Sequence, residues 1–505
     1  MTRAWIVPLA LAVVPGCLDV GAVDGDDEGG ATADEPSDPA TGEVEQGIYK
    51  TDAFGWGRDS NGVTTTVPIC WDERDYFKGP AEPARSTLKD FVRRAIEETW
   101  QRESGVQFSG WGDCHSGGGG TFGIDLHMET GGRGMTYVIH PFWEPQHADV
   151  HFGVGDGMTD YLRYTAIHEV GHALGLLHEQ ARGDNGGRCT MADDWDWIVR
   201  AWPGAVTTPW DDRSIMNYCA PNPTQLSPLD ILGIQRLYGR KTGANIMSAR
   251  GGCVSSVFGS IVTGSCGPGA LVGGFNPIGD AIRLINISFP PILGGSAMAP
   301  PAGGIGPLMF TTGAVNPGWD RYYFRNVSIR GLAGKKLNVA WASTSPGAAV
   351  NVWEDGSVGW ASNVAANEQW TFMSDGTIRG IGGQCLDVQW GSSAPGTPVW
   401  MWPCDANSAQ QWRLGPNDTI VSLVGGTTRC LEVDRDENDI STPLASGNPV
   451  RINLCNGTLR QKWNVRGPLT TMDNYGCITA PGAPGSVVSQ TACNGSTDQT
   501  VDVHW

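Results

Sequence analysis

The alternation of apolar and polar residues predicts both helices and strands in the first half of the chain. Apolar residues three and four apart predict an amphipathic helix, whose apolar face contains Leu88, Phe91, Val92, Ala95, Ile96 and Trp100. Phe122–Met128 alternates like a strand with one buried face. Further strands are predicted at Thr64–Cys70, Met135–Ile139 and Ala148–Val154.

Two more helices are indicated before residue 240. One spans roughly Asp160–Leu174. The other opens at Ser227, where Pro228 suits the first helical position and Asp230 can complete the cap, and it runs to about Tyr238. Together, these helices and strands predict an α/β domain over about residues 47–240.

The pattern changes after residue 240. Residues 241–320 are rich in Gly, Pro, Ala and Ser, which favours irregular β structure or a long linker. From about residue 321 the chain repeats, and the closing tryptophans are 42, 51 and 42 residues apart: Trp370, Trp412, Trp463 and, in a weaker fourth unit, Trp505. Such repeats pack around a shared core, to which each repeat supplies a buried Trp.

The N-terminus has the features of a targeting segment. An apolar run from Ala4 to Val14 follows Arg3, is too short to span a membrane, and is typical of a secretory signal. A small residue before Cys17 resembles a bacterial lipobox, in which the Cys thiol is lipidated after cleavage; ordinary cleavage is the alternative. Residues 19–45 carry ten Asp or Glu and no Lys or Arg, which predicts a solvated tether.

Charge and cysteine content narrow the function classes. The net charge of −19 and the lack of a basic patch argue against a nucleic-acid partner. Of 13 Cys, 12 remain if Cys17 carries lipid, enough for six disulfides and in keeping with export. Sequential pairing is the simplest hypothesis: Cys70 with Cys114, Cys189 with Cys219, Cys253 with Cys266, Cys385 with Cys404, Cys430 with Cys455, and Cys477 with Cys493.

One segment carries the spacing of a catalytic metal site. His168 and His172 are four residues apart on the predicted helix, so both imidazoles project from one face and can share an ion. Gly175 can end the helix, and His178 can then supply a third nitrogen. Three imidazoles with one water form an open catalytic Zn²⁺ site, whereas a structural zinc has four protein ligands. Glu169, beside the first ligand, can act on a metal-bound water.

The segment resembles the metzincin metalloproteases, HExxHxxGxxH followed by a Met-turn, here Ser214-Ile215-Met216-Asn217-Tyr218. Within that clan it is most similar to the astacins, which share a Glu directly after the third His, here Glu179. The resemblance covers roughly residues 160–240 well and residues 60–160 only in outline.

The resemblance implies a role for each matched residue. His168, His172 and His178 would bind one catalytic Zn²⁺. Glu169 would be the general base and then the proton donor to the leaving amine. Tyr218 would be an additional ligand that swings to stabilise the tetrahedral intermediate, and Met216 would form an apolar floor beneath the metal.

Two departures from the astacin pattern are visible. Asn217 stands where that family usually has His before the Tyr. In astacins the Glu after the third His contacts the N-terminus of the mature enzyme, and no clear propeptide junction is present here. The role of Glu179 is therefore left open.

The C-terminal repeats resemble the ricin-type β-trefoil, with its Cys-Leu-Asp openings and Gln-x-Trp closings, a family that often binds galactose-like sugars. The second repeat fits best, and the implied sugar contacts are Asp387, Trp402 and Gln410, with Asn407 as the alternative to Gln410. The first repeat has Trp353 but Asn338 in place of the acid. The third has Glu432 but Leu454 in place of the aromatic residue.

The expected protein is multidomain: an α/β (α+β) metzincin-type catalytic domain followed by an all-β β-trefoil domain. The expected divisions are a signal peptide with a lipobox-like end, an acidic disordered tether, a zinc metallopeptidase domain, a Gly/Pro-rich linker or irregular β region, and ricin-type β-trefoil repeats, at 1–17, 18–46, 47–240, 241–320 and 321–505.

The expected function is that of an exported zinc endopeptidase, either secreted or a lipoprotein at the cell envelope. It would cleave a protein or glycoprotein substrate and bind galactose-like glycans, and it would contact membrane only through a lipid anchor at Cys17. The first alternative is a non-catalytic lectin-like adhesin in which the peptidase fold is a spacer. The second is a zinc hydrolase acting on a non-peptide amide.

Overall fold

The structure is a computed structural model of the chain. It describes residues 12–13, 56, 65–72, 84–114, 123–129, 135–139, 147–153, 158–182, 185–190, 208–240, 245–249, 252–257, 260–264, 272–275, 281–285, 297–299, 306–307, 309–311, 321–354, 365–436, 446–471, 476–481 and 485–505. The predicted lipobox Cys17 and acidic tether lie outside these residues, as does the signal segment except for Ala12–Val13.

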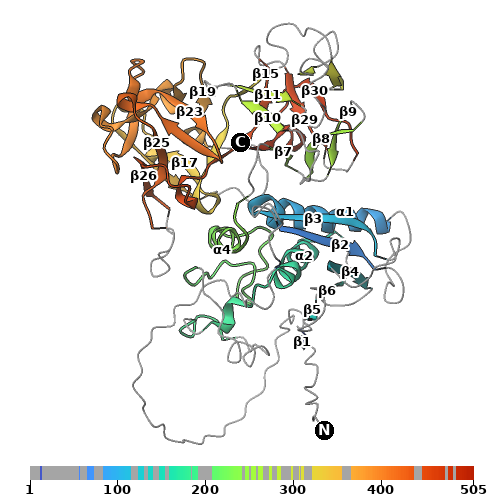
Figure 1. Cartoon of the computed structure of the whole chain (residues 1–505). Helices are drawn as coiled ribbons and strands as arrows, with labels where there is room; N and C mark the ends of the chain where they lie inside the picture. The colour runs from blue at the N-terminus through green and yellow to red at the C-terminus, as the bar shows by residue number, and fades with distance from the viewer. Residues whose placement is uncertain are drawn as a thin grey trace, which may run out of the picture.

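A mixed sheet forms one layer of the N-terminal region (Figure 1). Its strand order is β1-β5-β6-β4-β2-β3. The pairs β6–β4, β4–β2 and β2–β3 are parallel, whereas β5–β6 and β1–β5 are antiparallel. The bounds are β1 Ala12–Val13, β2 Thr65–Trp71, β3 Val106–Asp113, β4 Gly123–Glu129, β5 Met135–Ile139 and β6 His147–Gly153.

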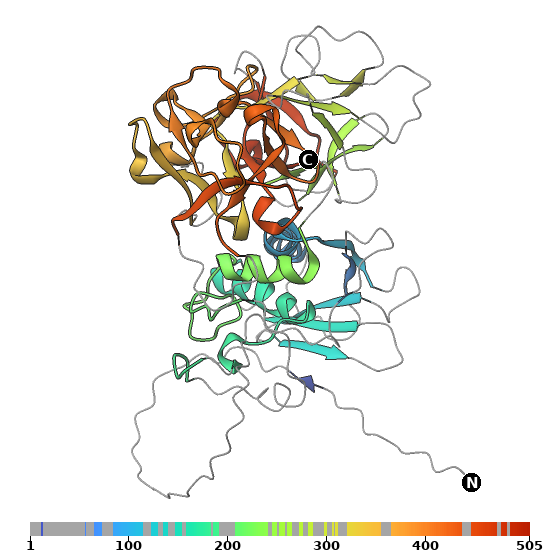
Figure 2. The same ribbon diagram turned by 60° about the vertical axis from the view of Figure 1, so that its left-hand side comes forward.

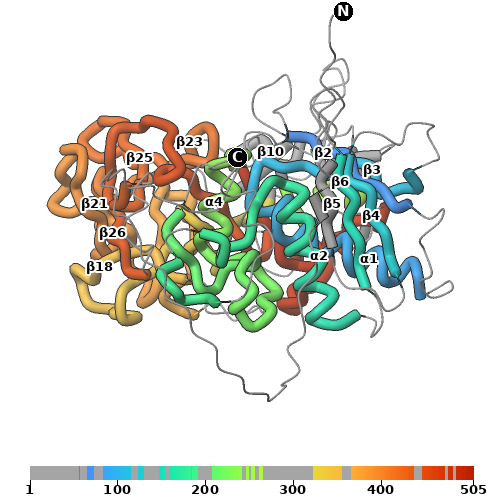
Figure 3. Tube along the Cα trace, turned by 90° about the horizontal axis from the view of Figure 1, so that it is seen from below, coloured from blue at the N-terminus to red at the C-terminus, as the bar shows by residue number. Residues whose placement is uncertain are grey.

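Three α-helices accompany this sheet: α1 Ala84–Ile96, continued by a π-helical turn over Glu97–Gln101; α2 Asp160–Ala173; and α4 Pro228–Tyr238. All three were predicted. α2 packs against α1, β5 and β6, and the view from below shows it beside the strands (Figure 3). The predicted cap of α4 is confirmed, because Ser227 and Asp230 exchange side-chain and backbone hydrogen bonds.

The strand prediction at Phe122–Met128 was right in type and wrong in burial. Ile124, Leu126 and Met128 face the helices, but Asp125 and His127 on the opposite face are only 7% and 4% exposed. Because β4 lies between β2 and β6, side chains of both neighbours pack beside this face: Cys70 Sγ of β2 lies 3.2 Å from Asp125 Oδ1, and Asp149 Oδ1 of β6 lies 3.1 Å from His127 Nε2. The edge strand β3 was not predicted from the sequence.

Above the helices lie two β lobes, which Figure 2 shows stacked over α1 and α4. The first lobe contains three of the predicted repeats. Its strands are β16 Ser328–Arg330, β17 Lys336–Val339, β18 Ala348–Trp353, β19 Thr371–Phe372, β20 Ile378–Arg379, β21 Cys385–Val388, β22 Val399–Trp402, β23 Trp412–Gly415, β24 Thr419–Ser422, β25 Arg429–Val433, β26 Asn448–Asn453 and β27 Asn464–Gly467.

The second lobe combines the described strands between residues 245 and 324 with the end of the chain, because β7 pairs with β31 and β13 pairs with β30. Its strands are β7 Asn245–Ser248, β8 Cys253–Val257, β9 Ser260–Gly264, β10 Val272–Phe275, β11 Ala281–Ile285, β12 Ala297–Ala299, β13 Gly306–Pro307, β14 Met309–Thr311, β15 Arg321–Phe324, β28 Leu469–Thr470, β29 Gly476–Thr479, β30 Ser489–Ala492 and β31 Val501–His504. The last repeat therefore pairs with strands from 245–311, where a linker and irregular β structure had both been left open.

Each of the first three repeats buries its closing tryptophan, as predicted. The indole Nε1 of Trp370, Trp412 and Trp463 donates to a backbone oxygen of its own repeat at 2.9 Å, that of Leu337, Leu386 and Leu431 in turn. This bond fastens the end of a repeat to its opening strand.

The fourth repeat closes differently from the prediction. Gln499 makes the bonds that Gln410 and Gln461 make in their repeats, so Val501 takes the place of the closing tryptophan. Trp505 instead donates from Nε1 to the backbone oxygen of Thr419 in the first lobe.

Five of the six sequential disulfides are confirmed: Cys70–Cys114, Cys189–Cys219, Cys385–Cys404, Cys430–Cys455 and Cys477–Cys493. The sixth predicted pair includes Cys266, which lies outside the described residues. Across the described part of the chain, helices fall short of the length and apolar character needed to cross a membrane.

Candidate functional site

The three predicted metal ligands converge on one point. The Nε2 atoms of His168, His172 and His178 are 3.2, 3.3 and 3.0 Å apart, and the side chains are almost completely buried. Four ligands around a tetrahedral Zn²⁺ at about 2.0–2.1 Å have nitrogen-to-nitrogen separations of about 3.3 Å. The spacing therefore fits three ligands of one ion.

Hydrogen bonds fix the orientation of two of these rings. Nδ1 of His168 lies 2.7 Å from the backbone oxygen of Ile215, and Nδ1 of His172 lies 2.7 Å from that of Leu176. A carbonyl only accepts, so each Nδ1 carries the proton and each Nε2 presents a lone pair to the common point. Lone pairs held this close repel one another unless a cation lies between them.

The local electrostatics favour neutral imidazoles. Burial, together with the neighbouring His178 and His168, holds the pKa of His172 well below its ordinary value. Metal-binding histidines must be deprotonated at the ligating nitrogen, so this environment prepares the ring for a cation. The donor set thus fits the zinc that the motif implies.

Met216 lies directly against the helix that carries the first two ligands. A Cβ added at Gly171 would lie 2.7 Å from the Met216 Sδ and 3.1 Å from the Trp100 ring. Only a glycine at this position lets the thioether and the indole approach the helix so closely. The turn is therefore packed against α2 one residue before His172.

A buried polar network fixes the Met216 turn. Asp230, which completes the capping box of α4 with Ser227, accepts from the Ser214 hydroxyl at 2.7 Å and from the Ile215 backbone N–H at 2.9 Å. The Glu179 backbone N–H donates to the Met216 backbone oxygen at 2.9 Å. This bond joins the turn to the residue that follows the third ligand, His178. The cap of one helix thus positions the carbonyl that orients His168.

Glu179, whose role the sequence left open, belongs to the same network. Its carboxylate accepts from Arg182 Nη1 at 2.8 Å and from the Asp211 backbone N–H at 2.7 Å. Burial raises the pKa of Glu179 to about 8, and the Arg182 guanidinium opposes that rise. Glu179, the residue after the third ligand His178, is therefore hydrogen-bonded to the backbone at Asp211.

Of the two predicted catalytic side chains, Glu169 lies on the helix that carries His168 and His172, and Tyr218 lies on the Met216 turn beside His178. Glu169 follows His168 in α2 and is 1% exposed. The Tyr218 ring is half-buried and lies 4.2 Å from the His178 ring between centroids. Its backbone N–H donates to Gln180 Oε1 at 3.1 Å, which ties it to the segment after the third ligand.

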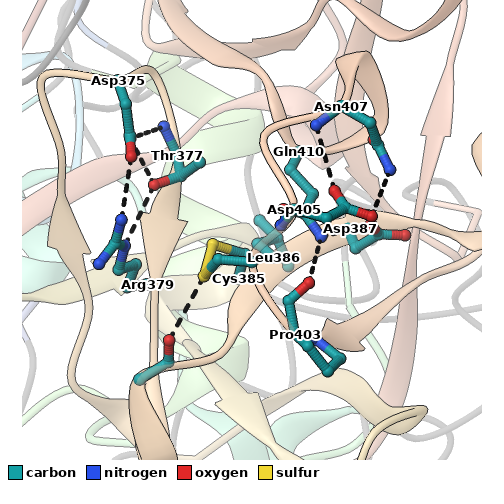
Figure 4. The surroundings of a disulfide bond; sticks show 12 residues. Asp375, Thr377, Arg379, Cys385, Leu386, Asp387, Pro403, Asp405, Asn407 and Gln410 are labelled. Carbon is teal, nitrogen blue, oxygen red and sulfur yellow. Dashed lines mark hydrogen bonds and ion pairs between the residues drawn. A yellow bond between two sulfur atoms is a disulfide. The ribbon is translucent and has the colours of Figure 1, made fainter.

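In the second trefoil repeat, two of the three predicted sugar contacts, Asp387 and Gln410, are hydrogen-bonded to each other, and Figure 4 shows these two side chains close together. Asp387 accepts from Trp400 Nε1 at 2.8 Å and from Gln410 Nε2 at 2.9 Å. Gln410 is fully buried and also accepts from the Asp405 N–H at 3.0 Å. Gln410 therefore positions Asp387, whereas half-buried Trp402 lies at the surface and stacks on Trp400 at 4.8 Å.

Asn407, the alternative contact, is exposed and caps a short turn. Its side-chain oxygen accepts from the Ala409 N–H at 2.7 Å, and its amide donates to Asp405 at 2.8 Å. These bonds give Asn407 a local structural role.

Strand register corrects the alignment of the third repeat. Cys385 faces Trp402 across its hairpin, and Cys430 faces Asn453, so Asn453 and not Leu454 occupies the aromatic position. The Glu432 carboxylate there accepts from Asn453 and Arg451, which leaves the repeat without an aromatic platform. Counting two residues back from the second Cys would have found this.

The first repeat holds an amide cluster that was not predicted from the sequence. Asn367 donates to the Asn338 oxygen at 2.6 Å, and Asn338 donates to the Asn351 oxygen at 2.8 Å. The adjacent Trp353 is 46% exposed. The signal was present in the position of Asn367, two residues before Gln369-Trp370.

A cavity of about 530 Å³ lies apart from both sites, where the helical region meets the β lobes. Ion pairs cross this junction: Arg466 to Glu103 at 3.1 Å and Arg213 to Glu354 at 2.8 Å. None of the three clustered histidines lines it. We regard it as part of the interface, because its charged lining side chains pair across the junction.

Comparisons with known proteins bear on the trefoil. Residues 325–445 match the model of the ricin-type beta-trefoil lectin domain. A search of curated proteins found no match.

Among solved structures, the chain resembles an agglutinin from Abrus precatorius at 21% identity, covering 34% of this chain and 62% of the agglutinin with a TM-score of 0.23. It resembles the C-half of an earthworm R-type lectin in complex with GalNAc at 20% identity, covering 28% of this chain and 97% of the lectin, with a TM-score of 0.23. A Macrolepiota procera ricin B-like lectin in complex with lactose matches at 18% identity over 30% of this chain and 98% of the lectin, with a TM-score of 0.22.

The chain thus spans less than two thirds of the agglutinin's length. The family match falls on the lobe whose repeats carry the buried closing tryptophans. Residues 325–445 of this chain therefore form a ricin-type β-trefoil lectin domain.

Proposed function

We propose that the chain is an exported zinc-dependent endopeptidase that uses its lectin domain to bind galactose-like glycans near its substrates. The supporting observation is the convergence of three buried Nε2 atoms, two of them held as lone-pair donors by carbonyls on the opposite nitrogen. The predicted signal segment and the disulfides support export.

The residues divide the chemistry between them. His168, His172 and His178 would hold the ion, which when bound lowers the pKa of a water to about 7 and polarises a carbonyl. Glu169 takes a proton at its carboxylate and returns it to the leaving amine. The Tyr218 hydroxyl donates to the oxygen on which negative charge develops, which stabilises the transition state. Met216, packed against Gly171, would form the apolar floor beneath the metal.

The proposed test is substitution of a ligand. His172→Ala should remove zinc from this site and abolish cleavage of casein, because only two of the three imidazole ligands remain. Zinc is measured by mass spectrometry and cleavage by gel. Full activity in a variant that has lost this zinc would sink the assignment.

In the lectin domain, we propose that glycan binds at Trp402 in the second repeat. A sugar stacks its apolar face on the indole, while Asp387, held by Gln410, accepts from its hydroxyls with its remaining lone pairs. The solved lectins above with GalNAc and lactose support a galactose-like ligand. Binding of labelled lactose to the wild type and to Trp402→Ala, with Leu454→Ala as an exposed control, tests this site.

The second candidate is a non-catalytic lectin-like adhesin, and one finding favours it: the family match covers the trefoil lobe alone. In that case the histidine region is a spacer. The two candidates differ in one observable. Both bind glycan, but only the endopeptidase cleaves a peptide while its zinc is bound.

A further inference from the structure

A second cluster of metal-binding side chains lies on the face of the N-terminal sheet that points away from the helices. Asp125 comes from β4, and His147 and Asp149 come from β6. One ligand atom from each of these three residues lies within 4.8 Å of the others. His127 and His151, also on this face, stack at 4.4 Å.

The register of the strands places like groups side by side. β4 and β6 are parallel, with Asp125 beside Asp149 and His127 beside His151. Neighbouring strands are about 4.8 Å apart, and like charges next to each other destabilise a sheet. A face that pairs acid with acid in this way is stabilised by a bound cation.

Polar contacts concentrate on Asp149. Its Oδ1 lies 3.1 Å from His127 Nε2 and 3.3 Å from His147 Nε2. Nδ1 of His147 is enclosed and lacks a hydrogen-bond partner among the described residues.

We propose that Asp125, His147 and Asp149 bind a second zinc ion, independent of the His168 site. An imidazole with two carboxylates is a zinc donor set, since calcium and magnesium take oxygen ligands alone. His127 orients Asp149 through its hydrogen bond, as outer partners of metal ligands do. The ion clamps β4 to β6, the strand against which α2 packs.

The test counts zinc per purified full-length chain after dialysis against a weak chelator. The wild type should hold two zinc ions, and Asp149→Asn and His172→Ala should each hold one. Glu129→Gln, a change on the same face outside the three proposed ligands, should hold two. Equal zinc content in the wild type and Asp149→Asn would overturn the proposal.

The unfolding temperature gives a second test, which does not require Asp149→Asn alone to fold. His172→Ala, which keeps only the proposed site, should unfold at a higher temperature when zinc is added, because zinc binds the folded form. Asp149→Asn combined with His172→Ala should show no shift. An unchanged midpoint in His172→Ala would also overturn the second site. Neither readout uses cleavage, so failure of the endopeptidase proposal leaves this count intact.

Discussion

The histidine region and the trefoil lobe differ in how their sequences specify the fold and the site residues. In the trefoil, three repeats share the same indole-to-carbonyl bond, but their surface groups diverge from Trp353 to Trp402 to Asn453. In the described part of the histidine region, no element repeats, and the His168–His178 segment and the Ser214–Tyr218 turn carry the proposed site. Repetition thus specifies a fold while leaving each site free to change, whereas a single motif specifies a site directly.

The largest expected effect is the difference in unfolding free energy between two tryptophan variants of one trefoil repeat, one in the buried core and one at the surface. Trp412→Ala removes a buried indole and its bond to Leu386, and should cost about 3–5 kcal/mol of unfolding free energy. Trp402→Ala, in the same repeat, loses a stacked partner and should cost about 1 kcal/mol. Urea unfolding measures both. Equal losses would contradict the division between buried scaffold and surface site.

In the histidine region, the next effect concerns the turn. Tyr218→Phe should lower kcat about 10²-fold, because the variant loses a donor to the developing oxyanion. Zinc content should be unchanged, since three imidazoles remain. Steady-state cleavage of a fluorogenic peptide checks this. A full rate in Tyr218→Phe would remove Tyr218 from the mechanism but leave the ligands in place.

A steric change at the base of the site should have a smaller effect. Gly171→Ala places a Cβ against Met216 and Trp100, and should destabilise the protein by about 1–3 kcal/mol through overpacking. Gly112→Ala is the control, since an added Cβ there meets nothing within 4 Å. If both variants were equally stable, the close packing of the turn on α2 would be refuted.

The smallest predicted effect lies at the junction of the two regions. Burial lowers the pKa of Lys335 to about 8, although Glu354 opposes this. Between about pH 8 and the ordinary value of 10.5, the unfolded chain binds more protons than the folded one, so stability rises with pH. Lys335→Met should lose that part of the slope. Denaturant titrations at several pH values would show a slope unchanged from the wild type if the prediction is wrong.

Local patterns predicted well what depends on local residues. The cap at Ser227, the approximate bounds of α2 and the closing tryptophans of the first three repeats follow from a few neighbouring side chains, and all of these features are found. The features that were not predicted depend on contacts with residues far away in the sequence. The burial of Asp125 requires β6 beside β4, and the pairing of the last repeat with 245–311 requires contacts over more than 200 residues.

The site follows the same rule. The ligand spacing is local, so the sequence indicated His168, His172 and His178 together. The bond that orients His168 comes from the Ile215 carbonyl, which depends on Asp230 in another helix. In the trefoil, the buried role of Gln410 became visible only through Asp387 on a separate strand.

The central claim is that the histidine cluster does chemistry, and Glu169→Gln tests it most directly. The substitution preserves size and all three ligands, so zinc content should equal that of the wild type. Cleavage of a peptide library should fall about 10²–10⁴-fold, the usual contribution of a general base. Equal cleavage by both proteins, or no cleavage by a zinc-loaded wild type, would contradict the account; the second outcome would favour the adhesin.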